Sequence, residues 1–391
     1  MHNSDYIRRL TTEAAELLKE MIAIPSTSFD EDAACGHVSC WLSEKGISHE
    51  RVGNNIIACG ITDPSKPNLM LCAHIDTVEP SPDYSFDPYK PDYEKAAEAV
   101  SLATGKPVGP TDIVAGLGSN DDGASAVAMI AAFRYFHTHS SDGMAATPNL
   151  VLVLTCEEER SGKNGMTGLW GSKICVRGEH TDGCIEIDHA IVGEPTGMKA
   201  ATSERGLLVI DGTAHGVSGH AARNEGENAL YIALEDIEKL RAHKFGKMSP
   251  RMGQVNMNIT QIHAGTAHNV IPDRCDFVVD IRPTEAYSNM EILEELQAIC
   301  RSELKPRNLS NRSSATSEDS PLQKAAEASG IETFSSPTTS DWMRIGCDAV
   351  KMGPGESSRS HKKDEYVLID EIRKGIETYI GFICNYEHTL E

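Results

Sequence analysis

The sequence lacks any apolar run approaching the 18 residues that indicate a membrane-spanning helix, so we expect no transmembrane segment. Its first residues also lack the apolar core of a secretory signal peptide. The spacing of Tyr6, Leu10, Leu17 and Leu18 instead predicts an amphipathic first helix. No internal repeat or sustained heptad is evident.

The cysteines lack the spacing of a disulfide framework or a zinc knuckle. The chain has 11 of them, an odd number, and no two form a Cys-x-x-Cys pair. Such usage is typical of reduced thiols, so the sequence predicts a cytoplasmic protein.

Basic residues are scarce relative to acidic ones. Lys and Arg number 36 against 58 Asp and Glu, which gives a formal net charge of −22 at pH 7. Because phosphates repel a strongly negative protein, we expect no nucleic acid and no anionic membrane as partner. At 391 residues, the chain exceeds the usual size of a single core, so we also expect two domains.

The most informative segment is an apolar run, Leu69–Thr77, that ends in His74 and Asp76. Residues two apart in a strand project from the same face. The two side chains would therefore lie side by side at a strand end, where open α/β sheets bind their ligands. A carboxylate beside an imidazole can fix the ring and make it a better metal ligand.

Further acidic or histidine residues follow in the same kind of position. They come from a glycine-rich turn before a helix, from two apolar runs and from a late loop: Asp121 in Gly116–Gly123, Glu157–Glu159 after Val151–Cys156, Glu194 after Ala190–Gly193, and His361. Parallel strands would bring these side chains to one edge of a sheet. Two histidines with several carboxylates suit a pair of zinc, cobalt or manganese ions that share an aspartate.

The order of these motifs resembles the M20 metallopeptidase and amidohydrolase family, over nearly the whole chain. The phrases Gly116–Ser125, Glu157–Gly165 and Met352–His361 are most similar to its acetylornithine deacetylase and succinyl-diaminopimelate desuccinylase branch. The resemblance implies an α/β fold. Its zinc-peptidase-like catalytic domain would have a mostly parallel central sheet with helices on both faces, and an α+β ferredoxin-like lid and dimerisation domain would be inserted into it.

The resemblance also implies a role for each candidate in the metal site. His74 and Glu194 would bind one ion, His361 and Glu159 the other, and Asp121 would bridge the two. Asp76 would orient His74, and Glu158 would be the general base. The triple Glu157-Glu158-Glu159 leaves the register of the base ambiguous, with Glu157 at the non-catalytic first position.

The domain boundaries follow from a change of pattern near residue 203. We expect residues 1–203 and 316–391 to form the catalytic domain and residues 204–315 the lid. In the lid, strands are predicted over 207–214, 254–262 and 275–281, and helices over 225–243 and 290–304. Two helices against a small sheet give the ferredoxin-like pattern.

The resemblance assigns further contacts outside the metal site. His220 would reach the active site of the other subunit of a homodimer and help to bind the oxyanion, and Asn269, Arg282 and Gly353 would bind substrate. An arginine suits a carboxylate because its planar fork can donate two hydrogen bonds. Two alternatives stay open: Arg282 paired with Asp280 or Glu285, and Asn269 capping a turn.

Residues 86–114 form a longer connection than the family usually has, with a helix-favouring run from Tyr93. We interpret it as an insertion at the rim of the active site, either a substrate-side flap or an oligomer contact.

The function implied is hydrolysis of the amide bond of a small N-acyl amino acid, such as N-acetylornithine or an N-succinyl amino acid of arginine-type biosynthesis. The resemblance implies two divalent ions, zinc by default with cobalt or manganese as alternatives, and such an ion lowers the pKa of its bound water to roughly 7. Glu158 would take the proton of that water. Arg223 or Arg359 near the acyl pocket would favour succinyl over acetyl. The alternatives are a dipeptidase or general aminoacylase of the same family, and a catalytically silent scaffold.

Overall fold

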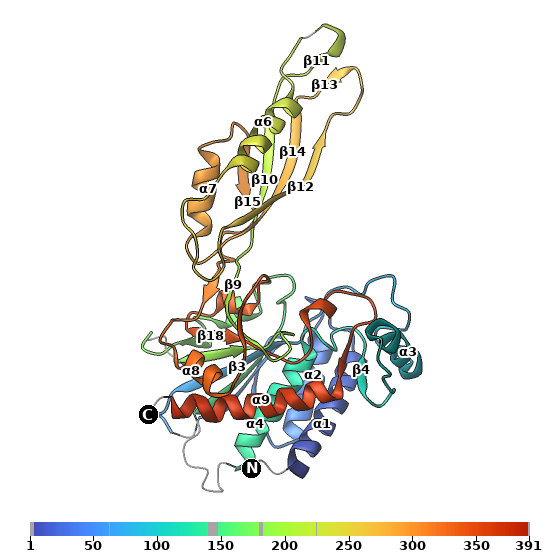
Figure 1. Ribbon diagram of the computed structural model, residues 1–391, viewed down its shortest axis with the longest axis vertical. Coiled ribbons are helices and arrows are strands. Elements are labelled where there is room, and N and C mark those ends of the chain that lie inside the picture. The colour runs from blue at the N-terminus through green and yellow to red at the C-terminus, as the bar shows by residue number, and fades with distance from the viewer. Residues whose placement is uncertain (1–3, 62, 140–147, 180–182, 224, 390–391) are drawn as a thin grey trace. The chain divides into compact units, whose positions relative to one another are not determined.

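The computed structural model describes residues 4–61, 63–139, 148–179, 183–223 and 225–389 (Figure 1). The chain divides into two compact units. The first comprises Met1–Thr202, Thr316–Phe334 and Ser340–Glu391, and the second Ser203–Ala315 and Ser335–Thr339. No helix among the described residues is long and apolar enough to cross a membrane.

The first unit is built on a mixed sheet whose centre is parallel. Its strands run in the order β1-β2-β5-β3-β8-β18-β9-β16, and β17 pairs with β9. The four central strands are parallel, whereas β1, β2, β9 and β16 pair antiparallel at the edges. The strand bounds are Glu50–Val52 (β1), Asn55–Gly60 (β2), Asn68–His74 (β3), Asn149–Thr155 (β5), His189–Val192 (β8), Ala200–Glu204 (β9), Ser314–Ala315 (β16), Thr333–Ser336 (β17) and Asp348–Lys351 (β18).

Strands β3 and β5 are buried along their whole length. That burial explains why their sequences are continuous apolar runs rather than alternating ones. Helices α1 (Ser4–Ile22), α4 (Gly123–His139) and α9 (Ile369–His388) pack together on one face, as Figure 1 shows. They are joined there by α2 (Asp32–Glu44) and α8 (Pro321–Ala328).

The other face carries a second apolar cluster that includes Met70, Val151 and Trp342. It is covered by the short helix α5 (Met166–Leu169), the 3-10 helix η2 (Asp341–Arg344) and strands β6 (Ile174–Val176) and β7 (Ile185–Ile187). The predicted mostly parallel sheet, covered on both faces, is confirmed, although the helices of this second face are short.

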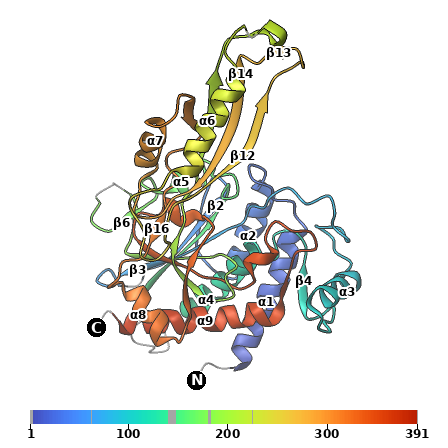
Figure 2. The same cartoon turned by 45° about the horizontal axis from the view of Figure 1, so that its top comes forward.

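The long connection after β3 contains helix α3 (Tyr93–Thr104), as its helix-favouring run predicts. The Asp92 side chain accepts hydrogen bonds from the N–H groups of Glu94 and Lys95 at its start, and Gly105 ends it in the left-handed conformation. Ala96, Ala97 and Val100 pack against β4 (Ile113–Ala115), which pairs with β19 (Tyr366–Leu368). Figure 2 shows α3 and β4 side by side.

The second unit is an antiparallel sheet of order β12-β14-β10-β15 with two helices. In chain order its elements are β10 (Leu208–His215), α6 (Ala229–Ala242), β12 (Asn256–Ala264), β14 (Arg274–Arg282), α7 (Asn289–Gln297) and β15 (Glu303–Pro306). This strand order and βαββαβ sequence confirm the predicted ferredoxin-like pattern. Alternate residues of β10 are buried, so one sheet face forms the core beneath the helices.

One predicted helix of this unit was too long. The prediction extended it to Leu304, but α7 ends at Gln297 and Glu303–Pro306 form the fourth strand. The buried carboxylate of Asp236 on α6 accepts hydrogen bonds from the N–H groups of Arg301 and Ser302. These bonds hold the chain in a turn that leads into β15.

Candidate metal centre

The candidate residues are brought together because three parallel strands end at the same level. His74 is the register partner of Thr155, and Cys72 that of Val192. The backbone ladder continues just beyond the strands, since Ile75 N donates to Thr155 O over 2.9 Å and Gly193 N to Cys72 O over 2.6 Å. The segments that carry His74, Glu158 and Glu194 therefore leave the sheet at one edge.

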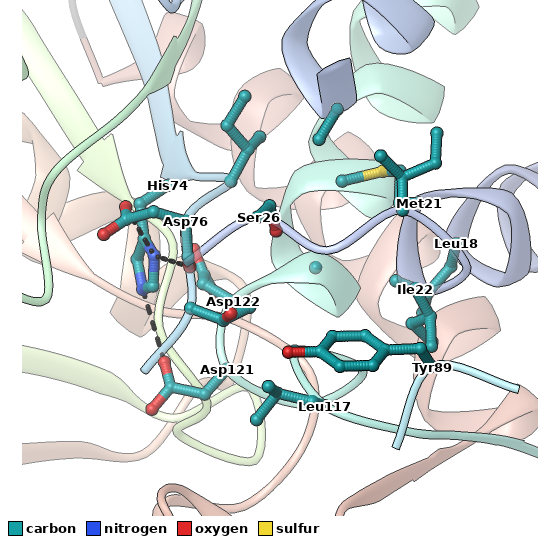
Figure 3. Close-up of a pocket in the computed structure, with 16 residues that line it drawn as sticks. Leu18, Met21, Ile22, Ser26, His74, Asp76, Tyr89, Leu117, Asp121 and Asp122 are labelled. Carbon is teal, nitrogen blue, oxygen red and sulfur yellow. Dashed lines mark hydrogen bonds and ion pairs between the residues drawn. The ribbon is translucent and has the colours of Figure 1, made fainter. Parts of the chain in front are cut away.

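His74 lies buried between two aspartates (Figure 3). Its Nδ1 is 3.0 Å from the backbone oxygen of Asp76 and 3.4 Å from Asp76 Oδ1, and its Nε2 is 3.3 Å from Asp121 Oδ1. Burial lowers the pKa of His74, but the hydrogen bonds with Asp121 and Asp76 outweigh it and raise this pKa well above its usual value. The ring is thus oriented from one side and presents its other nitrogen to Asp121.

Asp76 also fixes the backbone of the predicted base. Its Oδ1 accepts from Glu158 N at 3.0 Å, and its Oδ2 accepts from Glu159 N at 3.1 Å and from Ser28 Oγ at 2.6 Å. The buried carboxylate of Asp76 therefore fixes the positions of the His74 ring and of the backbone of Glu158 and Glu159 relative to one another.

Asp121 lies between the two histidines predicted to bind metal. Its Oδ1 faces His74 Nε2, and its Oδ2 is 3.7 Å from His361 Nε2. His361 Nε2 is also 2.9 Å from Glu159 Oε1. A carboxylate that offers one oxygen to each of two ligand pairs has the arrangement needed to bridge two cations.

The turn that carries Asp121 is held by a buried glutamate downstream of His361. The carboxylate of Glu365 accepts the backbone N–H groups of Gly118, Asn120 and Asp121 at 3.2, 2.8 and 2.9 Å. Gly118 has φ +77°, and a Cβ there would lie 2.6 Å from Thr77 Cγ2, so the turn requires glycine. Burial raises the pKa of Glu365 to about 8.

Two overlapping sets of donor atoms result. The ligand atoms of His74, Glu158 and Glu194 lie within 4.8 Å of one another, and so do those of His74, Asp121 and Glu159. Burial raises the pKa of Glu158 and of Glu194 well above the ordinary value, and neighbouring carboxylates add to the rise. Carboxylates that lose their contact with water are stabilised by cations or protons. Imidazole nitrogens and carboxylate oxygens at these positions fit a divalent ion such as zinc.

The structure distinguishes among the three consecutive glutamates. The Glu157 side chain is buried, and its carboxylate accepts hydrogen bonds from Asn164 N at 3.0 Å and Asn164 Nδ2 at 2.6 Å. Glu157 thus holds a loop, whereas Glu158 and Glu159 are the members whose carboxylates join the donor sets.

Sequence reasoning missed four residues that support the site. Ser28 donates to Asp76, and Glu365 holds the Asp121 turn. Buried Glu31 accepts from Phe29 N and Glu157 N through the same oxygen, at 2.7 and 3.2 Å. Buried Asp341 accepts from Thr155 Oγ1 at 2.6 Å, and burial raises its pKa to about 6. All four lie outside strands. Only Glu365 could have been found from the sequence, because it follows the candidate ligand His361 by four residues.

The candidates in the second unit are not all brought together. His220 on β11 (Gly219–His220) pairs with Val270 of β13 (Val270–Ile271), and Asn269 O accepts from Ala221 N at 3.0 Å. Arg282 instead ends β14, a strand of nine residues that spans about 27 Å. His220 and Asn269 thus share one end of this unit, and Arg282 lies at the other.

Two candidate contacts are engaged within the protein. The guanidinium of Arg282 donates two hydrogen bonds to Asp280, at 2.9 and 3.2 Å, which is one of the alternatives left open. Gly353 donates its N–H to Thr196 Oγ1 at 3.1 Å, and a Cβ there would lie 2.2 Å from Ser125 Oγ. Gly353 is therefore a close-packing position beside Glu194, and its N–H already has a partner.

The sequence suggested Arg359 as a cation for the acyl pocket, but in the structure this arginine is paired with a glutamate. Its guanidinium donates two hydrogen bonds to Glu371, at 2.7 and 2.9 Å, and stacks on the Tyr366 ring at 4.3 Å. Arg223, the other suggested cation, lies in the 3-10 helix η1 (Ala221–Arg223) of the second unit.

The insertion borders the candidate site. A cavity of about 730 Å³ is lined on one side by α3 and on the other by the segment 358–366, which includes His361. The position of α3 agrees with the interpretation as a rim element.

Two family models match this chain. The model described as "Peptidase dimerisation domain" matches residues 202–308, and that described as "Peptidase family M28" matches residues 55–230. Among curated proteins, an acetylornithine deacetylase of Myxococcus xanthus is 28% identical over 243 residues, which cover 57% of this chain and 61% of that relative. A succinyl-diaminopimelate desuccinylase of Halorhodospira halophila is 25% identical over 390 residues, covering 91% and 94%.

Among solved structures, a dinuclear metal binding peptidase of the M20 family from Bacillus subtilis is similar to this chain. It has a TM-score of 0.67 and 14% identity over 98% of this chain and 99% of that one. At this identity the likeness shows the fold. The dimerisation-domain match, the named relatives and this shared fold bear out the resemblance of the chain to the M20 metallopeptidase and amidohydrolase family.

Proposed function

We propose that this protein is a two-metal amidohydrolase that cleaves the amide bond of an N-acyl amino acid. The observation that carries the proposal is the position of Asp121, with one carboxylate oxygen toward His74 and the other toward His361. The candidate base Glu158 is held beside this arrangement by Asp76. The similarity to the M20 family supports the reaction class.

The residues suit two divalent ions. One ion would be held by His74, Asp121 and Glu194, and the other by Asp121, Glu159 and His361. Zinc fits the mixture of imidazole and carboxylate donors, with cobalt or manganese as alternatives. Such ions, when bound, supply Lewis-acid chemistry to the reaction.

The protein's own contribution is positioning and proton transfer. Glu158 takes a proton from the attacking water and passes it to the departing nitrogen. Its backbone is fixed by the hydrogen bond to Asp76, so the main chain that carries the base is positioned before the reaction. Burial raises the pKa of Glu158 above its ordinary value, which is the direction that favours a carboxylate as proton acceptor.

We further propose that the second unit acts in a homodimer, as the dimerisation-domain match suggests. His220 would help to bind the oxyanion in the site of the partner, with Asn269 beside it. Because Arg282 lies at the opposite end of β14, it and Asn269 cannot bind one carboxylate from the same subunit. A substrate held by both would need both subunits.

The names of the curated relatives support N-acetylornithine or an N-succinyl amino acid as substrate. A role in arginine-type biosynthesis is part of this proposal. The test is amine release from N-acetylornithine and from N-succinylcitrulline by the zinc-loaded or cobalt-loaded protein, with Glu158→Ala as control. Turnover of one of them that the mutation abolishes would establish the activity. Turnover of neither, with cleavage of dipeptides, would assign the protein to the peptidase alternative.

A further inference from the structure

We propose that Phe29 is a substrate-binding residue whose ring contacts the apolar carbon chain of the substrate at the rim of the metal centre. The inference rests on the proposed function, because it takes the cluster around His74 and Asp121 as the reaction site. It adds a specificity-determining contact that none of the sequence motifs contains.

The backbone conformation of Phe29 is unfavourable for its side chain. Its φ is +80°, in the left-handed region that bulky residues rarely occupy. Glycine or asparagine would make the same turn at lower free-energy cost. Strained residues of this kind collect at functional sites, and Glu157 and His361 also have positive φ here.

Hydrogen bonds on both sides hold this conformation. Phe29 N donates to Glu31 Oε1 at 2.7 Å, and Asp30 N donates to Thr27 O at 2.8 Å. The preceding residue, Ser28, donates its N–H to Thr77 O at 3.1 Å. The surrounding structure therefore determines where Phe29 lies.

The same contacts connect the Phe29 backbone to the segment that carries the predicted base. The oxygen of Glu31 that accepts from Phe29 N also accepts from Glu157 N, the residue before Glu158. On the other side, Ser28 Oγ shares Asp76 Oδ2 with Glu159 N. Two carboxylates, those of Glu31 and Asp76, thus connect the Phe29 segment to the Glu157–Glu159 segment.

The ring itself is available to a ligand, because Phe29 is 63% exposed. The hydrogen bonds of the Phe29 segment involve only the backbone of Phe29 and the side chain of Ser28. They therefore do not explain why the residue at this position is a phenylalanine. An exposed aromatic ring beside a polar site offers an apolar surface to aliphatic groups. Contact with the methylene chain of an acyl group or amino acid side chain would account for it.

The test is a binding measurement that does not require turnover. Zinc-loaded Glu158→Gln protein is titrated by calorimetry with N-acetylglycine, with N-acetylnorvaline, whose side chain is longer, and with N-butyrylglycine, whose acyl chain is longer. The titrations are repeated with Phe29→Asn, Phe29→Tyr or Ile61→Asn added. Ile61 is a matched control, since it is 42% exposed and lies outside the site.

Phe29→Asn should raise the dissociation constant of at least one longer-chain probe about tenfold relative to that of N-acetylglycine. This is the change expected for the loss of a contact to one or two methylenes. Its unfolding temperature should equal or exceed that of the parent, because asparagine tolerates the left-handed region. Phe29→Tyr and Ile61→Asn should keep the parent's ratio of dissociation constants.

An unchanged ratio in Phe29→Asn would overturn the inference, as would an equal loss in Phe29→Tyr or failure of all three probes to bind. If Phe29→Asn does not fold, Phe29→Ala gives the same ratio. Binding with the expected ratio, but no turnover of any probe by protein with Glu158 intact, would refute the proposed function and leave the contact standing.

Discussion

In the first unit, His74, Asp121 and the Glu158–Glu159 pair share hydrogen bonds and donor sets at one sheet edge, with His74 and Asp121 buried. In the second unit, His220 and Asn269 are exposed at one end of the sheet and Arg282 lies at the other. The first arrangement has the donor atoms of a candidate cation site within one unit. We propose that the residues of the second unit act on groups outside that unit, so the two regions should respond differently to mutation and to metal.

The largest effect should come from Glu158→Gln, which removes the base and leaves a side chain of the same shape. We expect kcat to fall by about 10²–10⁴-fold with the zinc content unchanged. Steady-state kinetics and metal analysis check this. Glu157→Gln, the same change one residue earlier, is the control and should keep kcat within about tenfold, since Glu157 only holds a loop. Equal losses in both variants would contradict the assignment of the base.

The corresponding change in the second unit is His220→Ala. Loss of an oxyanion donor should lower kcat by about 10²–10³-fold without loss of metal. Mixed dimers of His220→Ala and Glu158→Ala subunits should regain part of the activity if His220 acts in the partner's site. Absence of any rescue would mean that His220 does not act in the partner's active site, and that it acts either in the site of its own subunit or in none.

Removal of metal should separate the two units directly. At a free zinc concentration of about 100 times the dissociation constant, binding contributes about 2.7 kcal/mol to the unit that holds the ion. Chelation should therefore raise amide hydrogen exchange in β3 and in 155–160 and leave β10 and β14 unchanged. Equal changes in both units would break the comparison.

The smallest effect is expected from Asp76→Asn, which keeps the shape but weakens the acceptor for Glu158 N and Glu159 N. Changes at positions that orient ligands typically cost about 10–100-fold in metal affinity or activity. Zinc titration against a chromophoric chelator, together with kcat, measures both. A variant with wild-type values would show that Asp76 does not position the site.

The sequence predicted the residues at the strand ends because parallel pairing places them by a general rule. His74, Glu158 and Glu194 each follow an apolar run, and such runs pair in register whatever the loops do. The ferredoxin-like unit was predictable for a similar reason, since its elements alternate in a recognisable order.

The sequence could not predict contacts that tertiary structure sets. Glu31 accepts from Glu157 N across 126 positions, and Asp236 accepts from Arg301 N, in the turn after α7, across 65 positions. From the sequence alone, Arg359 could have been a cation in the acyl pocket; the structure shows that it pairs with Glu371. None of these partners is marked by a local pattern, because each depends on which loops meet.

The most direct test of the metal centre is the number of zinc ions bound per chain, measured by inductively coupled plasma mass spectrometry on wild-type protein and on Asp121→Asn. We predict two ions per wild-type chain and no more than one in the variant, because Asp121 faces both histidines. Wild-type protein that binds no zinc, cobalt or manganese, or a variant that keeps both ions, would contradict the account.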